Sequence, residues 1–369
     1  MNYSYWEYKE WFADNDFVIV GSGIVGLNCA IQLKEKFPTS KVLILEKGLL
    51  PQGASTKNAG FACFGSVSEL LSDLKTHSEE EVVQLVQKRW KGLELLRKML
   101  GDEKIDYQHH KGYELFQDKT FFETCKDEIP RLNKLLFPIF QEEVYTSTEN
   151  KFRFRNIVPN YIVNEFEGQI DTGKMMIELL KKARNLGIKI LNNVAVETYT
   201  DINKKVALKT NKGEVITKKL LLATNGFSKQ LIQEDIKPAR AQVLVTKPID
   251  KLHIKGTFHL EEGYYYFRNI NNRILFGGGR NLDFITEETT TFGQTQLIQE
   301  KLEQLLREVI LPNNKFEIEH RWSGIMGVGN QKKAIVKQIT NNTFCGIRLG
   351  GMGVAIGSLV GKELADLID

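Results

Sequence analysis

The hydrophobic pattern near the N-terminus consists of two continuous apolar runs with a glycine-rich turn between them. Residues 16–20 read Asp-Phe-Val-Ile-Val, and residues 41–46 read Lys-Val-Leu-Ile-Leu-Glu. Runs that are apolar at every position are typical of parallel strands buried on both faces. An apolar-periodic stretch from the glycines to about residue 36 predicts a helix between the strands. We therefore expect a strand–turn–helix–strand unit and an α/β fold class.

Helical and strand-like patterns alternate through the rest of the chain. A long amphipathic helix is predicted within residues 66–100, with Ser78 and Glu81 as a capping box. A second helix should begin after Asp171 and end at Gly187. Further helices are expected near residues 121–137 and 294–310, and from the closing glycines to residue 368. Strands are expected at residues 107–117, 152–167, 189–191, 195–199, 205–210, 219–223, 242–246, 264–268, 273–276 and 343–347.

Length and composition indicate a globular protein with more than one domain. At 369 residues the chain is long enough for about two domains. With 42% hydrophobic and 26% charged residues, it is neither a disordered nor a fibrous chain. The 50 basic and 46 acidic side chains leave a net charge of +4 without a long basic run, so we do not expect nucleic acid as a partner.

The first residues do not have the pattern of an export signal. They carry acids and aromatics where a signal peptide needs a basic start and an uninterrupted apolar stretch. The most apolar run, residues 17–33, is interrupted by Gly21, Gly23 and Gly26 and is shorter than a membrane span. We expect a cytoplasmic protein with no membrane span.

Cysteine and histidine spacing does not predict a metal site. The four cysteines, Cys29, Cys63, Cys125 and Cys345, lie far apart without any C-x-x-C pair, which argues against both a disulfide framework and bound zinc. We interpret them as buried small residues. The histidines also lack metal-ligand spacing, and we interpret them as surface or core residues.

The glycine turn has the spacing of a dinucleotide-binding motif. Gly21 would permit the tight turn, Gly23 would let a pyrophosphate touch the backbone, and Gly26 would let the helix pack closely. Glu46 ends the second strand, where its carboxylate could accept hydrogen bonds from ribose hydroxyls, and Lys47 follows it. The alternative, a structural glycine turn with an incidental acid, is less consistent with this context. The motif does not distinguish NAD from FAD.

Five segments along the chain resemble the D-amino acid oxidase family of FAD-dependent oxidoreductases. The resemblance spans nearly the whole sequence and is specific to the family, not to one substrate. Its segments are the N-terminal motif, GASTKNAG at 53–60, the strand with Val196, ATNG at 223–226, and the closing pair RWSGIMG (321–327) and RLGGMG (348–353).

The resemblance implies non-covalent FAD and a set of residues that hold it. It places the 53–60 segment along the pyrophosphate and flavin, Val196 at the adenine end, and the closing glycines beside the isoalloxazine. A helix starting at Gly353 would direct its positive end toward the flavin. The predicted cofactor-binding residues are Gly21, Gly23, Ile24, Val25, Gly26, Glu46, Lys47, Ser55, Thr56, Asn58, Ala59, Gly60, Val196, Ala223, Thr224, Asn225, Gly226, Gly350, Gly351, Met352 and Gly353.

Two departures from the family pattern affect the prediction. Relatives that attach FAD covalently use a His near the second motif or a Cys near RWSGIMG, whereas this chain has Lys57 and Ser323 or Gly324 there. Amino-acid oxidases of the family place a carboxylate-binding Arg where this chain has Met326. A bidentate clamp for a substrate carboxylate is therefore missing at that position.

Candidate substrate-site residues lie on a strand of the predicted substrate domain. With a period of two, Tyr264, Tyr266 and Arg268 share one face, and the resemblance places Tyr266 at the position of an active-site Tyr. The alternative is that the aromatics are sheet core and Arg268 is a solvated edge residue. Arg348 could replace the missing clamp or could equally cap backbone carbonyls. We take Tyr266, Arg268 and Arg348 as the catalytic candidates, with no metal.

The resemblance implies a Rossmann-like FAD/NAD(P)-binding domain and a smaller α+β substrate domain with an antiparallel sheet. The FAD domain is expected to be discontinuous, with residues 1–100, 150–236 and 320–369, and the substrate domain to comprise residues 101–149 and 237–319. The expected reaction is oxidation of the C–N bond of a small amine or amino acid by hydride transfer to flavin N5, followed by hydrolysis of the imine. Oxygen or another electron acceptor would complete the cycle, and the oligomeric state stays open.

Two other functions remain possible on the sequence alone. One is a flavin-dependent monooxygenase or another FAD- or NAD-linked dehydrogenase. The other is a non-catalytic flavin-holding or tRNA-associated protein, which would need a continuous basic surface that the small net charge does not suggest.

Overall fold

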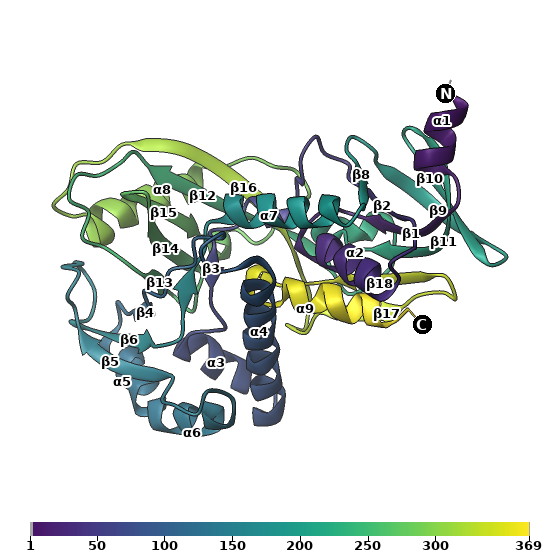
Figure 1. The fold of residues 1–369 in the computed structure, drawn as a ribbon. Coiled ribbons are helices and arrows are strands. Elements are labelled where there is room, and N and C mark those ends of the chain that lie inside the picture. The colour runs from purple at the N-terminus through teal and green to yellow at the C-terminus, as the bar shows by residue number, and fades with distance from the viewer. Residues whose placement is uncertain (1–2, 369) are drawn as a thin grey trace.

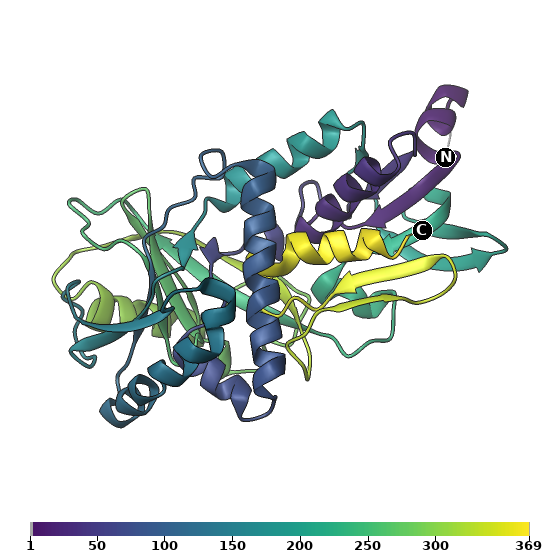
Figure 2. The ribbon, with the colours of Figure 1, turned by 60° about the horizontal axis from the view of Figure 1, so that its bottom comes forward.

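The computed structural model describes residues 3–368, and residues 1, 2 and 369, at the outer ends of the predicted FAD domain, lie outside them. Two large sheets lie side by side, each with helices packed on it (Figure 1). Helix α4 (Glu79–Leu100) stands between the two halves, where it packs against the C-terminal helix α9 (Gly353–Asp366) (Figure 2).

The first sheet contains the predicted strand–turn–helix–strand unit. Its order is β17-β18-β11-β1-β2-β8, and all neighbours are parallel except the edge strand β17. Strand β10 pairs with β11, and strand β9 pairs with β10, both in antiparallel orientation. The strands are β1 (Asn15–Val20), β2 (Val42–Leu45), β8 (Lys189–Leu191), β9 (Val196–Ile202), β10 (Lys205–Thr210), β11 (Gly213–Leu222), β17 (Ile335–Gln338) and β18 (Thr343–Ile347).

Helices from both ends of the chain cover this sheet. Helix α2 (Ile24–Lys36) follows the glycine turn and packs along α9 (Gly353–Asp366), which in turn packs on α4 (Glu79–Leu100). Helix α7 (Thr172–Asn185) packs on α2, and Asp171 caps it by accepting from the Lys174 amide, as predicted. The fully buried runs of β1 and β2 lie beneath these helices, which confirms the buried parallel strands predicted from the sequence.

The second sheet is antiparallel except for one pair, β13 with β4. Its order is β16-β12-β15-β14-β13-β4-β6-β5. Helix α8 (Gln296–Leu305) and the π-helix η5 (Leu306–Ile310) pack with one face of the sheet in an aromatic-rich core. The strands are β4 (Gly112–Leu115), β5 (Tyr145–Glu149), β6 (Asn160–Asn164), β12 (Lys237–Thr246), β13 (Thr257–Leu260), β14 (Tyr265–Ile270), β15 (Arg273–Gly278) and β16 (Ile318–Val328).

The helix predicted within residues 66–100 is divided in two. Helix α3 (Val67–Leu74) has its own capping box, Ser66 with Glu69, and α4 begins after the predicted box of Ser78 and Glu81. The remaining elements are α1 (Tyr5–Glu7), η1 (Tyr8–Phe12), η2 (Ala54–Thr56), β3 (Phe61–Ala62), α5 (Lys119–Asp127), α6 (Ile129–Phe140), β7 (Gly168–Gln169), η3 (Asn225–Gln230) and η4 (Arg280–Leu282).

Strand pairing changes two of the predicted domain boundaries. Strand β6 pairs with β4 and β5, and β16 pairs with β12 along almost its whole length. Both strands therefore belong to the second sheet, whereas the prediction gave residues 150–236 and 320–369 to the FAD domain. The boundary at residue 320 falls inside β16, whose ladder hydrogen bonds continue across it, and the boundary at residue 150 separates β5 from β6, which pair with each other. Within residues 3–368, none of the helices is both long and apolar enough to cross a membrane.

Candidate functional site

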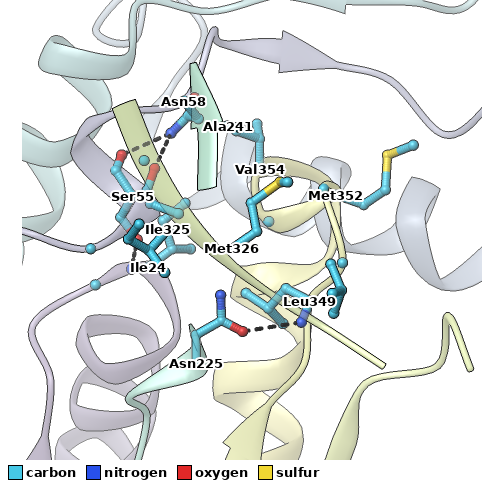
Figure 3. A pocket seen from close by; sticks show the side chains of 18 of the residues that line it. Ile24, Ser55, Asn58, Asn225, Ala241, Ile325, Met326, Leu349, Met352 and Val354 are labelled. Atoms are coloured by element: carbon cyan, nitrogen blue, oxygen red, sulfur yellow. Dashed lines mark hydrogen bonds between the residues drawn. The ribbon is translucent and has the colours of Figure 1, made fainter. Parts of the chain in front are cut away.

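A cavity of about 720 Å³ lies where the two sheets meet. Its wall combines the N-terminal glycine turn, the 53–60 loop, the end of β11, the start of α9 and the face of the second sheet. Figure 3 shows part of this wall, with Ile24 and Ser55 on one side and Leu349, Met352 and Val354 on the other. Segments more than 300 residues apart in sequence therefore share one site.

The glycine turn is shaped for close backbone approach. Gly21 has φ +102°, which favours glycine, and a Cβ there would lie 2.8 Å from the Ala223 carbonyl oxygen. A Cβ on Gly26 would lie 1.9 Å from the Gly21 carbonyl oxygen, so only glycine lets α2 pack this closely. The Ile24 amide at the start of α2 donates to Ser55 Oγ at 2.9 Å. The positive end of α2 thus faces the cavity, as an anion-binding helix terminus does.

Glu46 is a buried carboxylate at the cavity wall. Its Oε2 accepts from the Ser22 amide at 3.0 Å and from Ser22 Oγ at 2.7 Å, and its Oε1 accepts from the Gly48 amide at 3.0 Å. A carboxylate has about four acceptor positions, so capacity remains for a hydroxyl of a ligand. The neighbouring Lys47 ammonium lies 3.3 Å from the centre of the Phe227 ring, and burial lowers its pKa.

Asn58 shapes the 53–60 loop. Its amide nitrogen donates to the carbonyl of Ser55 at 2.8 Å (Figure 3). Its Oδ1 accepts from the Gly60 amide at 2.9 Å and from Thr172 Oγ1 at 2.8 Å. These bonds tie the loop to the start of α7. The backbone amides and small side chains of the loop are thereby held at the cavity wall.

Asn225 joins the end of β11 to the closing glycine loop. Its Oδ1 accepts from the Leu349 amide at 3.3 Å (Figure 3) and from the Arg348 amide at 3.1 Å. Helix α9 begins at Gly353, directly after this loop, so its N-terminus opens on the cavity.

Most of the predicted cofactor residues line the cavity. Three lie outside its lining: Gly26 packs on Gly21, the Thr56 hydroxyl donates to the Pro51 carbonyl at 2.5 Å, and Gly226 packs on the Met326 carbonyl. Their roles are in packing and turn formation. The predicted residues that line the cavity are Gly21, Gly23, Ile24, Val25, Glu46, Lys47, Ser55, Asn58, Ala59, Gly60, Val196, Ala223, Thr224, Asn225, Gly350, Gly351, Met352 and Gly353.

Strand β14 alternates between the core and the cavity. Tyr265 and Phe267 lie in the aromatic core, whereas Tyr264, just before the strand, and Tyr266 line the cavity. The Tyr266 ring packs edge-on to Phe61, with ring centres 5.6 Å apart. Burial raises the pKa of Tyr266 to about 12, so its hydroxyl keeps its proton at neutral pH.

The two predicted arginines lie outside the cavity lining. Arg268 shares the face of Tyr266, but its guanidinium donates to the carbonyls of Ala59 and Ile170, and burial lowers its pKa to about 10. Arg348 donates to the Lys333 carbonyl at 3.0 Å and pairs with Asp235 at 2.8 Å. Both join chain segments to one another, which is a structural role. Met326, which stands where amino-acid oxidases of the resembled family have a carboxylate-binding Arg, does line the cavity.

Sequence reasoning missed His259 as a cavity residue. It lies directly across from Tyr266 in the β13–β14 ladder, and its Nε2 is 2.6 Å from Glu167 Oε1. Burial alone would lower its pKa, but the charge of Glu167, its hydrogen bond, and the charges of Glu69 and Glu114 together raise it to about 9. Strand register could not be inferred from the pattern, because β13 is only four residues long and was not predicted.

Arg89 and Arg280 were also missed and both line the cavity. Arg89 is buried on α4 and donates to the Phe64 carbonyl at 2.7 Å. Arg280 follows β15 in the short helix η4. Neither position has a sequence motif, so only the fold brings them to the site. Among residues 3–368 no cluster of His, Cys, Asp and Glu could hold a metal ion.

The residues present fit a dinucleotide cofactor. A helix N-terminus, two glycine positions that a Cβ would block, and a buried carboxylate after the second strand are the elements that bind the pyrophosphate and ribose of such a ligand. The fold and site thus define a nucleotide-cofactor-binding protein of the α/β class, with the second sheet closing the cavity.

Comparison with known proteins identifies the family. The model of the DAO family, described as FAD dependent oxidoreductase, matches residues 16–367. The chain therefore belongs to the DAO family of FAD-dependent oxidoreductases, which confirms the resemblance drawn from its motifs.

Individual relatives are distant but nearly full-length. Probable oxidoreductase OrdL of Haemophilus influenzae is 21% identical over 372 residues, covering 96% of this chain and 82% of that protein. Glycine oxidase from Geobacillus kaustophilus superposes with a TM-score of 0.77 at 17% identity, covering 96% of this chain and 94% of that one. L-proline dehydrogenase from P. horikoshii gives 0.75 at 19% identity, covering 96% and 93%. These structures share the fold, including the Rossmann-like domain and the antiparallel-sheet domain.

Proposed function

We propose that the protein oxidises the C–N bond of a small amine or amino acid, with release of an imine that water hydrolyses. The observation that carries the proposal is the placement of Tyr264 and Tyr266 in the same cavity as the dinucleotide-binding loops. A substrate held by the second sheet would meet the cofactor in that cavity. The relatives named for glycine and L-proline oxidation support the reaction class.

The chain's own residues supply binding, orientation and shelter from water. When bound, FAD supplies a hydride acceptor at N5 for the carbon next to nitrogen. The glycine turn, Glu46 and the 53–60 loop would hold the nucleotide and pyrophosphate, and the start of α9 would face the flavin with its positive end. Tyr266 keeps its proton and would hydrogen-bond the substrate beside the flavin. Positioning of this kind, rather than an acid–base triad, is what hydride transfer requires.

Flavin reduction without nicotinamide tests the proposal. The purified holoenzyme is mixed anaerobically with a panel of amines and amino acids, and the visible flavin absorbance is followed. Bleaching by a member of the panel in the absence of NADH and NADPH is the expected result, and admitting air then shows whether oxygen accepts the electrons. A flavin that dithionite or NADPH reduces, but that no amine or amino acid does, would contradict the proposal and favour a monooxygenase or another dehydrogenase.

We also propose that FAD is held without a covalent bond. Ser323 is buried and accepts from the Gly293 amide at 2.9 Å, and Gly324 has no side chain. The nearby Cys63 lines the cavity, but burial raises its pKa well above the usual range, so it is a poor nucleophile.

A further inference from the structure

Arg268 is a buried cation directly behind the cavity wall. Only 3% of the residue is exposed, and its guanidinium donates to the carbonyls of Ala59 and Ile170. Asp106 and Asp171 act on it by charge, but no carboxylate of the described part of the chain lies within ion-pair distance of its guanidinium. Burial lowers its pKa to about 10, so the side chain remains charged at neutral pH. A positive charge is therefore fixed in the interior without a direct counter-ion.

A glycine lets the guanidinium lie against the 53–60 loop. A Cβ on Gly60 would lie 2.8 Å from Arg268 Nη2 and 2.3 Å from the Ile170 carbonyl oxygen. Gly60 also has φ +75°, which favours glycine. Both Ala59 and Gly60 line the cavity, whereas Arg268 does not. The guanidinium therefore contacts, from behind, the part of the loop that a ligand in the cavity meets.

This part of the loop lies at the substrate end of the cavity. Ser55, near the start of the loop, accepts from the amide at the start of α2, which is the anion-binding end. Phe61, directly after the loop, packs edge-on to Tyr266 with ring centres 5.6 Å apart. Ala59 and Gly60 therefore lie toward the tyrosine, where a flavin has to lie if it is to meet a substrate held by the second sheet.

Behind Arg268 lies a second cavity, of about 130 Å³. Polar side chains make up most of its wall, among them Asp106, Gln169 and Asp171. Their dipoles and charges offset part of the cost of burying the guanidinium. The cation is thus stabilised from the side of this second cavity, while its bonds to the loop stay in place.

The cations of the main cavity lining differ from Arg268 in how they can act. Lys47, Lys57 and Arg280 line that cavity and have aromatic rings as neighbours, so their side chains can turn toward a ligand. Arg268 is held by two hydrogen bonds and does not line the cavity. Its charge can therefore act on a ligand only through the peptide that it binds, from a fixed position.

We infer that Arg268, besides joining chain segments, is a positioning residue whose charge raises the reduction potential of FAD bound against Ala59 and Gly60. A hydride brings two electrons and one proton, so the reduced flavin carries one more negative charge than the oxidised flavin. A fixed positive charge behind the loop stabilises that added charge, and buried surroundings screen it less than water would. The inference rests on the binding of FAD and not on the identity of the substrate.

The reduction potential of the bound flavin tests the inference without any substrate. The holoenzyme is titrated anaerobically with dithionite in the presence of a reference dye. Arg268→Gln should lower the potential by about 30 mV, which is about a tenfold change for a two-electron couple, and Arg268→Lys should recover most of the loss because it keeps the charge. Arg273→Gln, a surface arginine of β15 paired with Glu319, is the matched control and should equal wild type. A wild-type potential in Arg268→Gln would overturn the inference.

The affinity for FAD in its two redox states separates this role from a purely structural one. Arg268→Gln should weaken the binding of reduced FAD to the deflavinated protein about tenfold more than the binding of oxidised FAD, because the two affinities and the potential form one thermodynamic cycle. An equal loss of affinity for both forms would show that Arg268 only shapes the loop, and the inference would then be wrong.

A variant outside the loop decides the matter if Arg268→Gln does not retain FAD. Asp106→Asn removes a negative charge from the second cavity and should raise the potential. Asp102→Asn, a surface aspartate paired with Arg97, is its control and should leave the potential unchanged. An unchanged potential in Asp106→Asn would then count against the inference, and a raised one would support it. If no amine or amino acid reduces the flavin while its potential still depends on Arg268, the proposed function fails and the inference stands.

Discussion

At the scale of single residues, the neighbouring Tyr265 and Tyr266 of strand β14 lie in different environments, one in the core and one at the cavity. The hydroxyl of Tyr265 is buried without a partner among the described residues, whereas that of Tyr266 opens on the cavity. Alternation along a strand is the cause, and it follows from sequence period alone. Which face of the strand lines the cavity depends on the segments that pack against the sheet. The sequence alone could therefore not show that Arg268 binds the Ala59 and Ile170 carbonyls and does not reach the cavity.

The tyrosine pair gives a matched prediction. Tyr266→Phe should slow flavin reduction by about 5- to 150-fold, because it removes one hydrogen bond to the substrate worth about 1–3 kcal/mol, and should leave stability nearly unchanged. Tyr265→Phe should leave the rate unchanged and stabilise the fold by about 1 kcal/mol, since it removes an unpaired buried hydroxyl. Stopped-flow absorbance and urea unfolding measure the two effects. Equal rates for wild type and Tyr266→Phe would remove Tyr266 from the active site.

The buried pair of His259 and Glu167 predicts a pH dependence of stability. The folded-state pKa of about 9 exceeds the unfolded value of about 6.5, so the stabilisation from the protonated form is complete below pH 6.5 and is lost as pH rises through 9. Urea unfolding from pH 6 to 9.5 should show a decline for wild type that is smaller in His259→Gln. Parallel profiles for the two proteins would show that His259 does not titrate this way.

At the scale of elements, the helices and strands that depend on local sequence were predicted correctly. The β1–α2–β2 unit and the cap of α7 were confirmed because each rests on local periodicity, glycine or capping residues. The capping box predicted at Ser78 and Glu81 does begin α4, but the separate helix α3 before it was not predicted, because apolar positions continue on both sides of the break. Strands β13 and β16 were missed because each pairs with a strand distant in sequence, β13 with β4 and β16 with β12, and propensity does not describe such pairing.

The packing of α2 on the glycine turn gives a prediction at this scale. Gly26→Ala places a methyl group 1.9 Å from the Gly21 carbonyl oxygen, so α2 must move away from the turn and FAD affinity should fall at least 10-fold. Gly173→Ala in α7 is the control, because its Cβ would approach only the Asp171 side chain, at 3.2 Å. FAD titration of the deflavinated proteins by fluorescence quenching measures both. Wild-type FAD affinity in Gly26→Ala would contradict the packing role.

At the scale of the whole molecule, the cavity joins segments from both ends of the chain and from both sheets. A ligand that contacts both sheets and both ends of the chain should raise the free energy of unfolding of the whole protein. FAD at one hundred times its dissociation constant should add about 2.7 kcal/mol, so the holoenzyme should melt at a higher temperature than the deflavinated protein in a thermal scan. No difference in melting temperature at saturating FAD would contradict binding across the cavity.

The mode of FAD attachment is tested on the same preparation. Heat or acid denaturation should release the flavin into the supernatant, because the structure offers no reactive nucleophile at the positions of covalent attachment. Yellow colour that stays with the precipitated protein after washing would show a covalent bond.

The sequence by itself determined the cofactor-binding unit and the family, because a glycine turn, a buried strand and a helix start are local features with local physical causes. Tertiary structure alone decided which side chains of the second sheet line the cavity. Tyr266, His259 and Arg280 come together through strand register and a tight glycine turn, and Arg268 and Arg348 are taken up by backbone carbonyls from distant segments. Contacts of that kind depend on closing the chain in three dimensions, and no neighbouring residues in the sequence encode them.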